Sequence, residues 1–419
     1  MSENQINNNE ELSFDSLLEK LNEGDKKSPP KDIISDIEGE LEKAVADDCG
    51  IKTVTENGMT FVDVTAQYVK KKEDSEETPK SEPLQKKKIR TFNEIFADFF
   101  RKVLPQKQDK TREKIRKIVL DISVLTIIGC VIAFGSLFKD HLVEVSQGNN
   151  IQGSIVDVDD LSSEQYDAAW QELFSKYPTI DFPSGMNLKY AYLYAINQEL
   201  VGWLKIPGTN LDVQVVQATD NEKYLKTDFY GKKSRYGCPY VDYRNDAKYL
   251  DDNTVIYGHH MSDGLMFSNL DKYKTIEGYK ESPVIQYDTI YQTYYFKIVA
   301  AFVTNSLAED DNGYIFNYTV TDFSSDEKFM SYVDEIRKRS IFNTDVSVLP
   351  DDKLLTLSTC SYEFSKARLV VVARLCRENE EPVVDTSSAV INTVPRYPQA
   401  WYDAKNMANP YKDDVNWTP

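Results

Sequence analysis

A thiol, an imidazole and a guanidinium each lie in, or at the end of, an apolar β-prone run of this sequence. Cys360 closes the run 354–359, and Arg368 lies eight residues after Cys360. His259 comes directly after the run 253–258. A thiol nucleophile needs a proton carrier, and a cation must hold the oxyanion that forms when the thiolate attacks a carbonyl. Because the chain has only three histidines and five cysteines, few other residues could build such a site.

Cys360 has a structural alternative, since a cysteine at the end of a strand often serves as a small buried apolar residue. Here residues 361–363 begin a polar turn, which predicts a thiol at the mouth of the fold. If Arg368 starts the neighbouring strand, the short loop brings its guanidinium to the thiol, where it favours thiolate and can donate to an oxyanion. A surface role for Arg368 stays open, and Arg374, on the same strand face, is a weaker competitor.

The histidines narrow the choice of proton carrier. His141 lies three residues past a long apolar span, and we expect that it does not reach the mouth of the fold. His259 and His260 follow a strand, and adjacent residues of a strand point to opposite faces, so only one of them should face Cys360. Gly258 before them permits a close backbone approach or unusual dihedral angles.

A long apolar span follows the most basic part of the chain. Residues 86–117 carry twelve basic and four acidic side chains, and the span 118–138 has 21 residues with one charge near its edge. About 20 apolar residues cross a bilayer as a helix. A buried core helix is the alternative, but the basic flank favours a membrane because positive charge stays on the cytoplasmic side. We predict an uncleaved signal anchor, with 1–117 in the cytoplasm and 139–419 outside.

Composition limits the partners and cofactors. The net charge of −19 argues against nucleic acid as a partner. Residues 1–85 are rich in Glu, Asp, Lys, Asn and Ser and poor in aromatic residues, which predicts a largely disordered region. Outside the membrane would lie Cys238, Cys360 and Cys376, an odd number without paired spacing. That pattern predicts neither a disulfide framework nor a zinc site, and thiol chemistry needs no cofactor.

Short apolar strands separated by turns dominate the chain between about 160 and 376. Helices are predicted from the capping box at 162–165 to Pro178, over 186–198, and near 325–339. Strands are expected at 201–206, 211–216, 237–242, 253–258, 284–287, 293–303, 354–358 and 368–375. This spacing predicts a mostly β fold, either a closed antiparallel-rich barrel or a sandwich.

Three segments together resemble the sortases, the cysteine transpeptidases of Gram-positive cell surfaces, and class B in particular. Thr-Leu-Ser-Thr-Cys at 356–360, followed by Arg368, is similar to the sortase signature. Tyr-Gly-His-His-Met-Ser-Asp-Gly-Leu-Met-Phe at 257–267 resembles the histidine region of class B, and Val-Gly-Trp-Leu-Lys-Ile-Pro-Gly-Thr at 201–209 resembles an early barrel segment. The resemblance covers about 160–376 and implies a sortase-like closed β-barrel with N-terminal helices and an inserted helix.

The resemblance also implies a role for each candidate residue. Cys360 would be the nucleophile, His259 the proton carrier, and Arg368 the clamp for the oxyanion and the substrate. The neighbours would have lesser roles: Ser358 and Thr359 in positioning the substrate backbone, Glu363 in orienting the histidine, and His260 as a bystander.

The implied reaction is a transpeptidation in two stages. The thiolate attacks a threonyl carbonyl in the sorting motif of an exported protein, and an amino group of a peptidoglycan precursor then resolves the thioester. A pilin-polymerising transpeptidase, with a lysine of another pilin as acceptor, would use the same residues. A third alternative is a non-enzymatic membrane scaffold, in which 1–117 binds cytosolic partners and the barrel binds the cell wall.

The regions expected along the chain are an acidic disordered cytosolic region 1–85, a basic amphipathic juxtamembrane segment 86–117, the transmembrane signal anchor 118–138, a linker 139–160, a sortase catalytic domain 161–377 and a polar C-terminal extension 378–419. Within the juxtamembrane segment, 92–104 is predicted to be a helix that lies on the inner membrane face or binds a partner. The long cytosolic region and the extension depart from the family pattern.

Overall fold

The computed structural model describes residues 53–56, 59–62, 101–158 and 160–419. It divides into two units, Met1–Phe99 and Phe100–Pro419. In the first unit, β1 (Thr53–Glu56) and β2 (Met59–Val62) form an antiparallel pair. The rest of the predicted disordered region, and most of the predicted amphipathic helix 92–104, lie outside the described residues.

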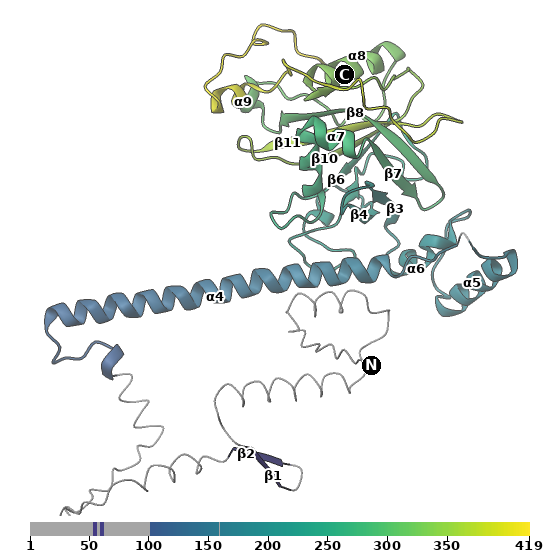
Figure 1. The fold of residues 1–419 in the computed structure, drawn as a ribbon. Helices are drawn as coiled ribbons and strands as arrows, with labels where there is room; N and C mark the ends of the chain where they lie inside the picture. The colour runs from purple at the N-terminus through teal and green to yellow at the C-terminus, as the bar shows by residue number, and fades with distance from the viewer. Residues whose placement is uncertain (1–52, 57–58, 63–100, 159) are drawn as a thin grey trace, which may run out of the picture. The chain divides into compact units, whose positions relative to one another are not determined.

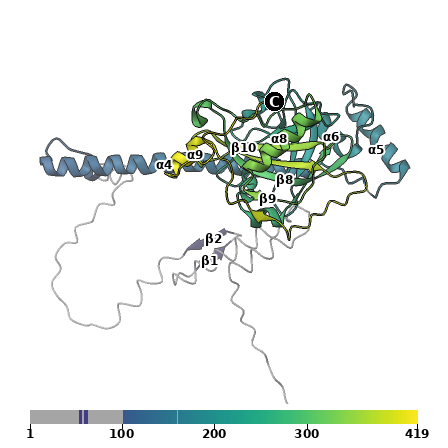
Figure 2. The same cartoon turned by 90° about the horizontal axis from the view of Figure 1, so that it is seen from above.

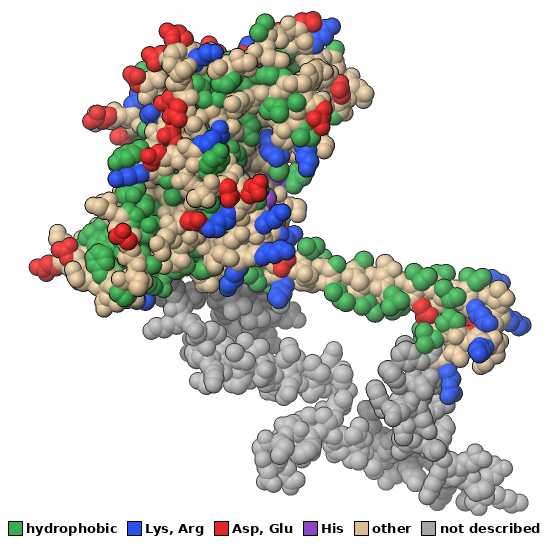
Figure 3. Space-filling view, turned by 180° about the vertical axis from the view of Figure 1, so that it is seen from behind, with side chains coloured by type: hydrophobic (Ala, Val, Ile, Leu, Met, Phe, Trp, Pro, Cys, Tyr) green, Lys and Arg blue, Asp and Glu red, His purple; other side chains and the backbone are tan. Residues whose placement is uncertain are grey.

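The predicted membrane span forms part of one unbroken helix, α4 (Thr111–Gln152), of 42 residues (Figure 1). It is long and apolar enough to cross a membrane, and the side chains of its apolar part are exposed. Figure 3 shows hydrophobic side chains along this part and Lys and Arg side chains at its free end. The predicted linker 139–160 is helical as far as Gln152, because no proline interrupts it and its first glycine comes only at Gly148.

Two helices precede the barrel, as predicted. Helix α5 (Ser163–Lys176) begins with a capping box, in which Ser162 and Gln165 each accept a hydrogen bond from the other's backbone N–H. Helix α6 (Leu188–Ile196) is capped by Asn187, whose side chain accepts from the backbone N–H of Lys189. These caps satisfy N–H groups that the first turn of a helix leaves without partners.

Eight strands close into a barrel, which confirms the predicted barrel and excludes the sandwich. Around the ring they are β10 (Leu354–Cys360), β11 (Ala367–Leu375), β8 (Thr293–Asn305), β7 (Val284–Thr289), β3 (Leu200–Lys205), β4 (Asp212–Val216), β5 (Tyr240–Val241) and β6 (Asn253–Tyr257). The pairs β10–β6 and β4–β5 are parallel and the other neighbours are antiparallel.

Strand alternation decides which side chains fill the barrel. Leu355, Leu357, Leu369 and Val371 belong to the interior cluster, whereas Leu354, Val370 and Val372 pack in the cluster that includes side chains of helix α8 (Asp326–Arg339). Figure 2 shows α8 over β8 on the outside of the barrel. Because side chains alternate with a period of two, the even-numbered residues at the ends of β10 and β11 point out of the barrel wall.

Short elements complete the domain: the 3-10 helices Lys223–Leu225, Phe267–Lys274 and Ala308–Asp311, helix α7 (Ile276–Glu281), strands β9 (Phe342–Asn343) and β12 (Val390–Ile391), and helix α9 (Gln399–Ala404). Strand β12 pairs with β9, and the Gln399 N–H donates to Asp311 at 2.9 Å. The polar extension therefore packs on the domain.

The cation Arg374 is buried at the far end of β11, with 2% of its surface exposed. It pairs with the Glu380 carboxylate, which also binds Lys297 at 2.8 Å. Arg374 lies opposite Leu354 in the sheet, six residues from Arg368, or about 20 Å along an extended strand. Arg374 is therefore a structural residue, and the prediction that it competes for the thiol is wrong.

We expect Glu380→Gln to lower the free energy of unfolding at pH 7 by about 1–2 kcal/mol, because Arg374 loses its ionic partner while partial exposure screens the pair. Arg374, with Lys297, holds the pKa of Glu380 far below its ordinary value. The stabilisation is then fully present above the unfolded pKa of about 4.3 and shrinks as the pH falls below it. Urea unfolding of the full chain in detergent at pH 7 and pH 3 measures both values. An equal difference at the two pH values would contradict the assignment.

Candidate active site

Cys360 and Arg368 lie directly opposite each other in the antiparallel pair β10–β11. Residues paired in this way point to the same face, with Cβ atoms about 5 Å apart. Both side chains are half-buried, at the mouth of the barrel as predicted. The Arg368 Nη1 donates to the Ala367 carbonyl at 3.1 Å and to the Lys366 carbonyl at 3.5 Å, so both contacts use the same one of the three guanidinium nitrogens.

His259 reaches the same place from the other side of β10. In the parallel pair β6–β10, Tyr257 lies beside Ser358, and the Gly258 N–H donates to the Ser358 carbonyl at 3.2 Å. Strand β6 ends at Tyr257, so His259 follows two residues past the last paired position, on the side of β10 opposite to β11. The predicted thiol and guanidinium therefore lie opposite each other on β10 and β11, and the predicted imidazole follows β6, the other neighbour of β10.

A backbone carbonyl holds the His259 ring. Its Nε2 lies 2.8 Å from the carbonyl oxygen of Leu225. Because a carbonyl oxygen can only accept, Nε2 carries a proton in this contact, and Nδ1 is the nitrogen left to exchange a proton with a thiol or an amine. Sequence reasoning missed this contact, since a backbone carbonyl carries no signal in the residue type.

Two glycines allow the close packing around His259. A Cβ on Gly258 would lie 2.5 Å from the Phe267 ring, so of the two predicted reasons for this glycine the close approach applies. Gly237 has φ +63°, and a Cβ there would lie 2.3 Å from the Tyr224 carbonyl oxygen and 3.2 Å from Cδ2 of His259. Gly237 therefore permits the loop that carries Leu225 to close on the histidine.

His260 has different partners from His259. Its Nε2 lies 2.7 Å from the Asp271 carboxylate. Its ring packs edge-on against the Tyr362 ring, with the two ring centroids 4.9 Å apart. Glu363 accepts a hydrogen bond from Ser361 and pairs with Lys274 at 3.0 Å. The expected role of Glu363 in orienting the histidine stays a prediction.

The residues before the thiol have different surroundings. The Ser358 Oγ lies 2.9 Å from the hydroxyl of Tyr318, and Ser358 shares the outer face with Cys360. Thr359 lies on the opposite face of β10, and its buried Oγ1 has no hydrogen-bond partner among the described residues. The substrate-positioning roles of Ser358 and Thr359 stay predictions.

Tyr318 is a component of the site that sequence reasoning missed. Burial raises the pKa of its hydroxyl, and the charge of Arg368 opposes that rise while Cys360 adds to it. Both groups therefore lie close enough to Tyr318 to act on it electrostatically. With 26 tyrosines in the chain, nothing in the sequence distinguishes this one.

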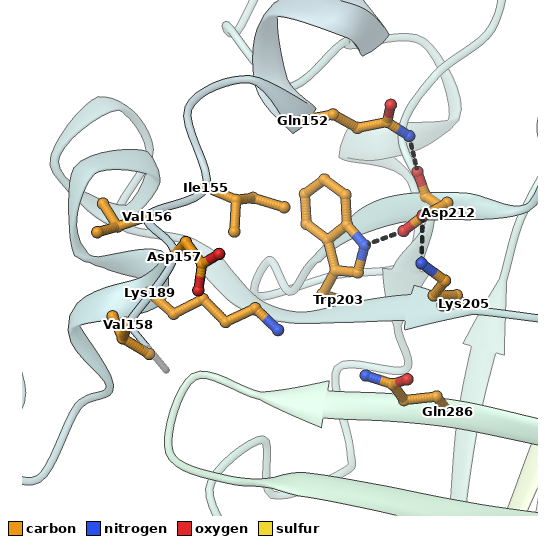
Figure 4. A pocket seen from close by; sticks show the side chains of 10 residues that line it. All are labelled: Gln152, Ile155, Val156, Asp157, Val158, Lys189, Trp203, Lys205, Asp212 and Gln286. Atoms are coloured by element: carbon orange, nitrogen blue, oxygen red, sulfur yellow. Dashed lines mark hydrogen bonds and ion pairs between the residues drawn. The ribbon is translucent and has the colours of Figure 1, made fainter. Parts of the chain in front are cut away.

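A cavity of about 450 Å³ lies elsewhere on the domain (Figure 4). Its lining includes Trp203 and Lys205 of β3, Asp212 of β4 and Gln286 of β7. The indole N–H of Trp203 and the ammonium of Lys205 both bind Asp212, at 2.5 and 2.9 Å. Strand β3 is four strands from β10 in either direction around the ring, so this cavity is separate from the thiol. Among the described residues, no group of His, Cys, Asp and Glu could hold a metal ion.

Known proteins share this domain. The family model described as the sortase domain matches residues 204–376. Sortase B of Staphylococcus aureus (strain NCTC 8325 / PS 47) is 34% identical over 216 residues, which is 51% of this chain and 83% of that protein. Sortase B of Listeria monocytogenes serovar 1/2a (strain ATCC BAA-679 / EGD-e) is 34% identical over 185 residues, 44% of this chain and 72% of that protein.

Solved sortase B structures are also similar. A complex of the Staphylococcus aureus enzyme with substrate is 34% identical, with a TM-score of 0.42, over 51% of this chain and 93% of that one. The Bacillus anthracis enzyme in complex with AAEK1 is 33% identical, with a TM-score of 0.41, and the match covers 50% of this chain and 96% of that one. With 34% identity over 83% of the length of a known sortase B, and with the sortase motifs at the mouth of one closed barrel, the chain belongs to the sortase family and is a sortase B-like cysteine transpeptidase.

Proposed function

We propose that this transpeptidase cleaves a sorting motif in exported proteins and joins them to a peptidoglycan amine, with Cys360, His259 and Arg368 as its catalytic residues. The observation that carries the proposal is the strand register around β10, which sets Cys360 opposite Arg368 of β11 and pairs β10 with β6, the strand that His259 follows by two residues. Sortase B of Staphylococcus aureus, a relative, forms a complex with a substrate, which is consistent with a substrate for this chain as well.

In the first stage the Cys360 thiolate attacks the carbonyl carbon of a threonine in the sorting motif. The oxyanion that forms accepts hydrogen bonds from the Arg368 guanidinium on the same face of the sheet. Collapse of this intermediate breaks the peptide bond and leaves a thioester on Cys360. The protonated His259 gives its Nδ1 proton to the departing amine and keeps its Nε2–H on the Leu225 carbonyl.

In the second stage an amino group of a peptidoglycan precursor attacks the thioester carbonyl. His259, now neutral at Nδ1, accepts the proton that the amine must lose, and Arg368 again holds the oxyanion. The thiolate leaves, and a new amide bond joins the exported protein to the precursor. The imidazole returns to its protonated form, so one cycle consumes no external acid or base.

We further propose that α4 anchors the enzyme with its N-terminus in the cytoplasm and its catalytic domain outside. The apolar part of the helix and the basic residues before it support this orientation. The helix contacts the catalytic domain directly, since the His141 Nδ1 lies 3.1 Å from Asp263 and the Gln152 amide donates to the Asp212 carbonyl at 2.8 Å. His141, which we expected to lie away from the mouth of the fold, therefore reaches the loop after His260. These contacts would hold the barrel close to the outer surface of the bilayer, while 1–117 remains available to a cytosolic partner on the other side.

Cys360→Ala should abolish the acyl-enzyme, because no thiol remains at the barrel mouth. Cys376→Ala is the matched control, since Cys376 is half-buried just past the opposite end of β11. The full chain is incubated with peptides that carry threonine at the scissile bond, and intact-mass spectrometry detects the adduct. We expect the adduct in the wild type and in Cys376→Ala only. An adduct on Cys360→Ala would sink the assignment of the nucleophile.

Arg368→Lys should lower kcat/KM by about 10²–10³, because a single ammonium cannot replace the two-pronged donor of the guanidinium. Its unfolding midpoint should stay at the wild-type value, since Arg368 is half-buried at a strand end. Arg374→Lys is the contrasting variant and should lose stability through its buried pair with Glu380. Peptide turnover and thermal unfolding, measured on both variants, separate the catalytic role of Arg368 from the structural role of Arg374. Wild-type turnover in Arg368→Lys would contradict the catalytic role of Arg368.

Gly237→Ala should impair catalysis more than Gly231→Ala. Both glycines have positive φ, +63° and +74°, so an added Cβ brings similar backbone strain. Only the Cβ at Gly237 meets other atoms, those of Tyr224, Leu225 and His259, whereas nothing lies within 4 Å at Gly231. We expect a loss of about tenfold or more in turnover for Gly237→Ala relative to Gly231→Ala. Equal turnover in the two variants would show that the loop does not position the histidine.

A further inference from the structure

One aromatic side chain anchors the end of the polar extension. In the segment 412–419, Trp417 is half-buried and the other residues are exposed, Val415 to 91%. The Trp417 ring packs against Phe316 and Tyr332, with centroids 5.7 and 5.6 Å away. Its indole N–H donates to the Ser331 hydroxyl at 3.0 Å. This side chain therefore joins the extension to α8 and to the loop that precedes α8.

The loop that Trp417 covers has little regular structure of its own. It runs from the end of β8 to α8 and includes only the short 3-10 helix Ala308–Asp311. Asn312 and Gly313 turn the chain with φ +53° and +93°. A long loop of this kind takes its position from side-chain contacts. The Tyr314 hydroxyl, which donates to the Trp417 carbonyl at 2.9 Å, is one such contact.

The two residues whose rings Trp417 covers also bond to Tyr318, Tyr332 through its hydroxyl and Phe316 through its backbone carbonyl. The Tyr332 hydroxyl donates to the Tyr318 carbonyl at 3.0 Å, and the Tyr318 N–H donates to the Phe316 carbonyl at 2.9 Å. The Tyr318 hydroxyl in turn lies 2.9 Å from Ser358, two residues before the thiol. A continuous set of contacts thus runs from Trp417 through Phe316 and Tyr332 to the wall of the active site.

We propose that Trp417 is a positioning residue, through which the C-terminal extension holds Tyr318 in the substrate-binding wall beside Cys360. This inference rests on the proposed function, because it assigns Tyr318 to the wall against which the sorting peptide binds. Loss of the Trp417 ring leaves the carbon, sulfur and nitrogen atoms of the chemistry in place but loosens the loop. The binding of the peptide should weaken while the chemical steps keep their rates.

The test compares Trp417→Ala with Trp417→Phe and Trp401→Ala in the full chain. Trp401 is a matched control, because it lies in the same extension and stacks on Tyr397 at 3.9 Å. We expect Trp417→Ala to raise KM for the peptide about tenfold, with kcat within about twofold, because two aromatic contacts are lost. Trp417→Phe should restore most of the affinity and Trp401→Ala should leave KM unchanged. A KM for Trp417→Ala equal to that of Trp401→Ala would overturn the proposal.

A double variant shows whether the effect passes through Tyr318. In a Tyr318→Ala background, Trp417→Ala should raise KM no further, since the residue that it positions is absent. If the rise in KM of the double variant equals the product of the rises in the two single variants, the substitutions act independently. That result would overturn the positioning role even if each variant weakens binding.

Hydrogen exchange keeps this inference separate from the proposed reaction. Trp417→Ala should speed amide exchange over 314–320, and Trp401→Ala should not, whether or not a peptide is turned over. Unchanged exchange over that loop would refute the link between Trp417 and Tyr318. Absence of any acyl-enzyme in the wild type, together with faster exchange in Trp417→Ala, would refute the proposed reaction and the substrate role but leave the mechanical link in place.

Discussion

The register of three adjacent strands is the constraint on which the candidate site depends. Strand β10 pairs in parallel with β6 and antiparallel with β11, so segments about a hundred residues apart end side by side. A slip of one residue in β10 would turn Cys360 toward the apolar interior and expose Leu357 and Leu355 to the outside. The buried side chains that fill the barrel therefore also hold the thiol on the outer face. The same strand register is needed for the packing of the core and for the position of Cys360.

The sequence was sufficient for the parts of the site that follow from strand periodicity. His259, Cys360 and Arg368 could be placed together because each follows or begins an apolar run, and a period of two decides which face each one takes. The same rule predicted that only one of the two adjacent histidines would face the thiol, and the resemblance to sortases indicated His259; His260 pairs with Asp271. Arg374 lies on the same face of β11 as Arg368, so strand alternation alone could not exclude it from the site. Its separation from the thiol and its burial with Glu380 depend on tertiary structure.

The parts that the sequence did not reveal come from loops. Leu225 acts through its carbonyl oxygen, Gly237 through the absence of a side chain, and Tyr318 from a loop that joins β8 to α8. Such contacts are non-local and have no periodic signature, so pattern arguments cannot find them. The continuation of α4 through the predicted linker was missed for a related reason. A polar helix that ends against the Asp212 segment gains its stability from that tertiary contact, which a composition argument does not include.

These two classes of contact divide the work of the enzyme. The ring of strands positions the atoms that make and break bonds, and strands in a closed barrel have little freedom to move. The loops at its mouth provide the walls, and both flanking regions of the chain contact them. Helix α4 reaches the loop after His260 through Asp263, and the extension reaches the loop of Tyr318 through Trp417. Segments outside the barrel can therefore alter how a substrate is held without disturbing the thiol, the imidazole or the guanidinium, because they contact only the part of the site that the strand register leaves undetermined.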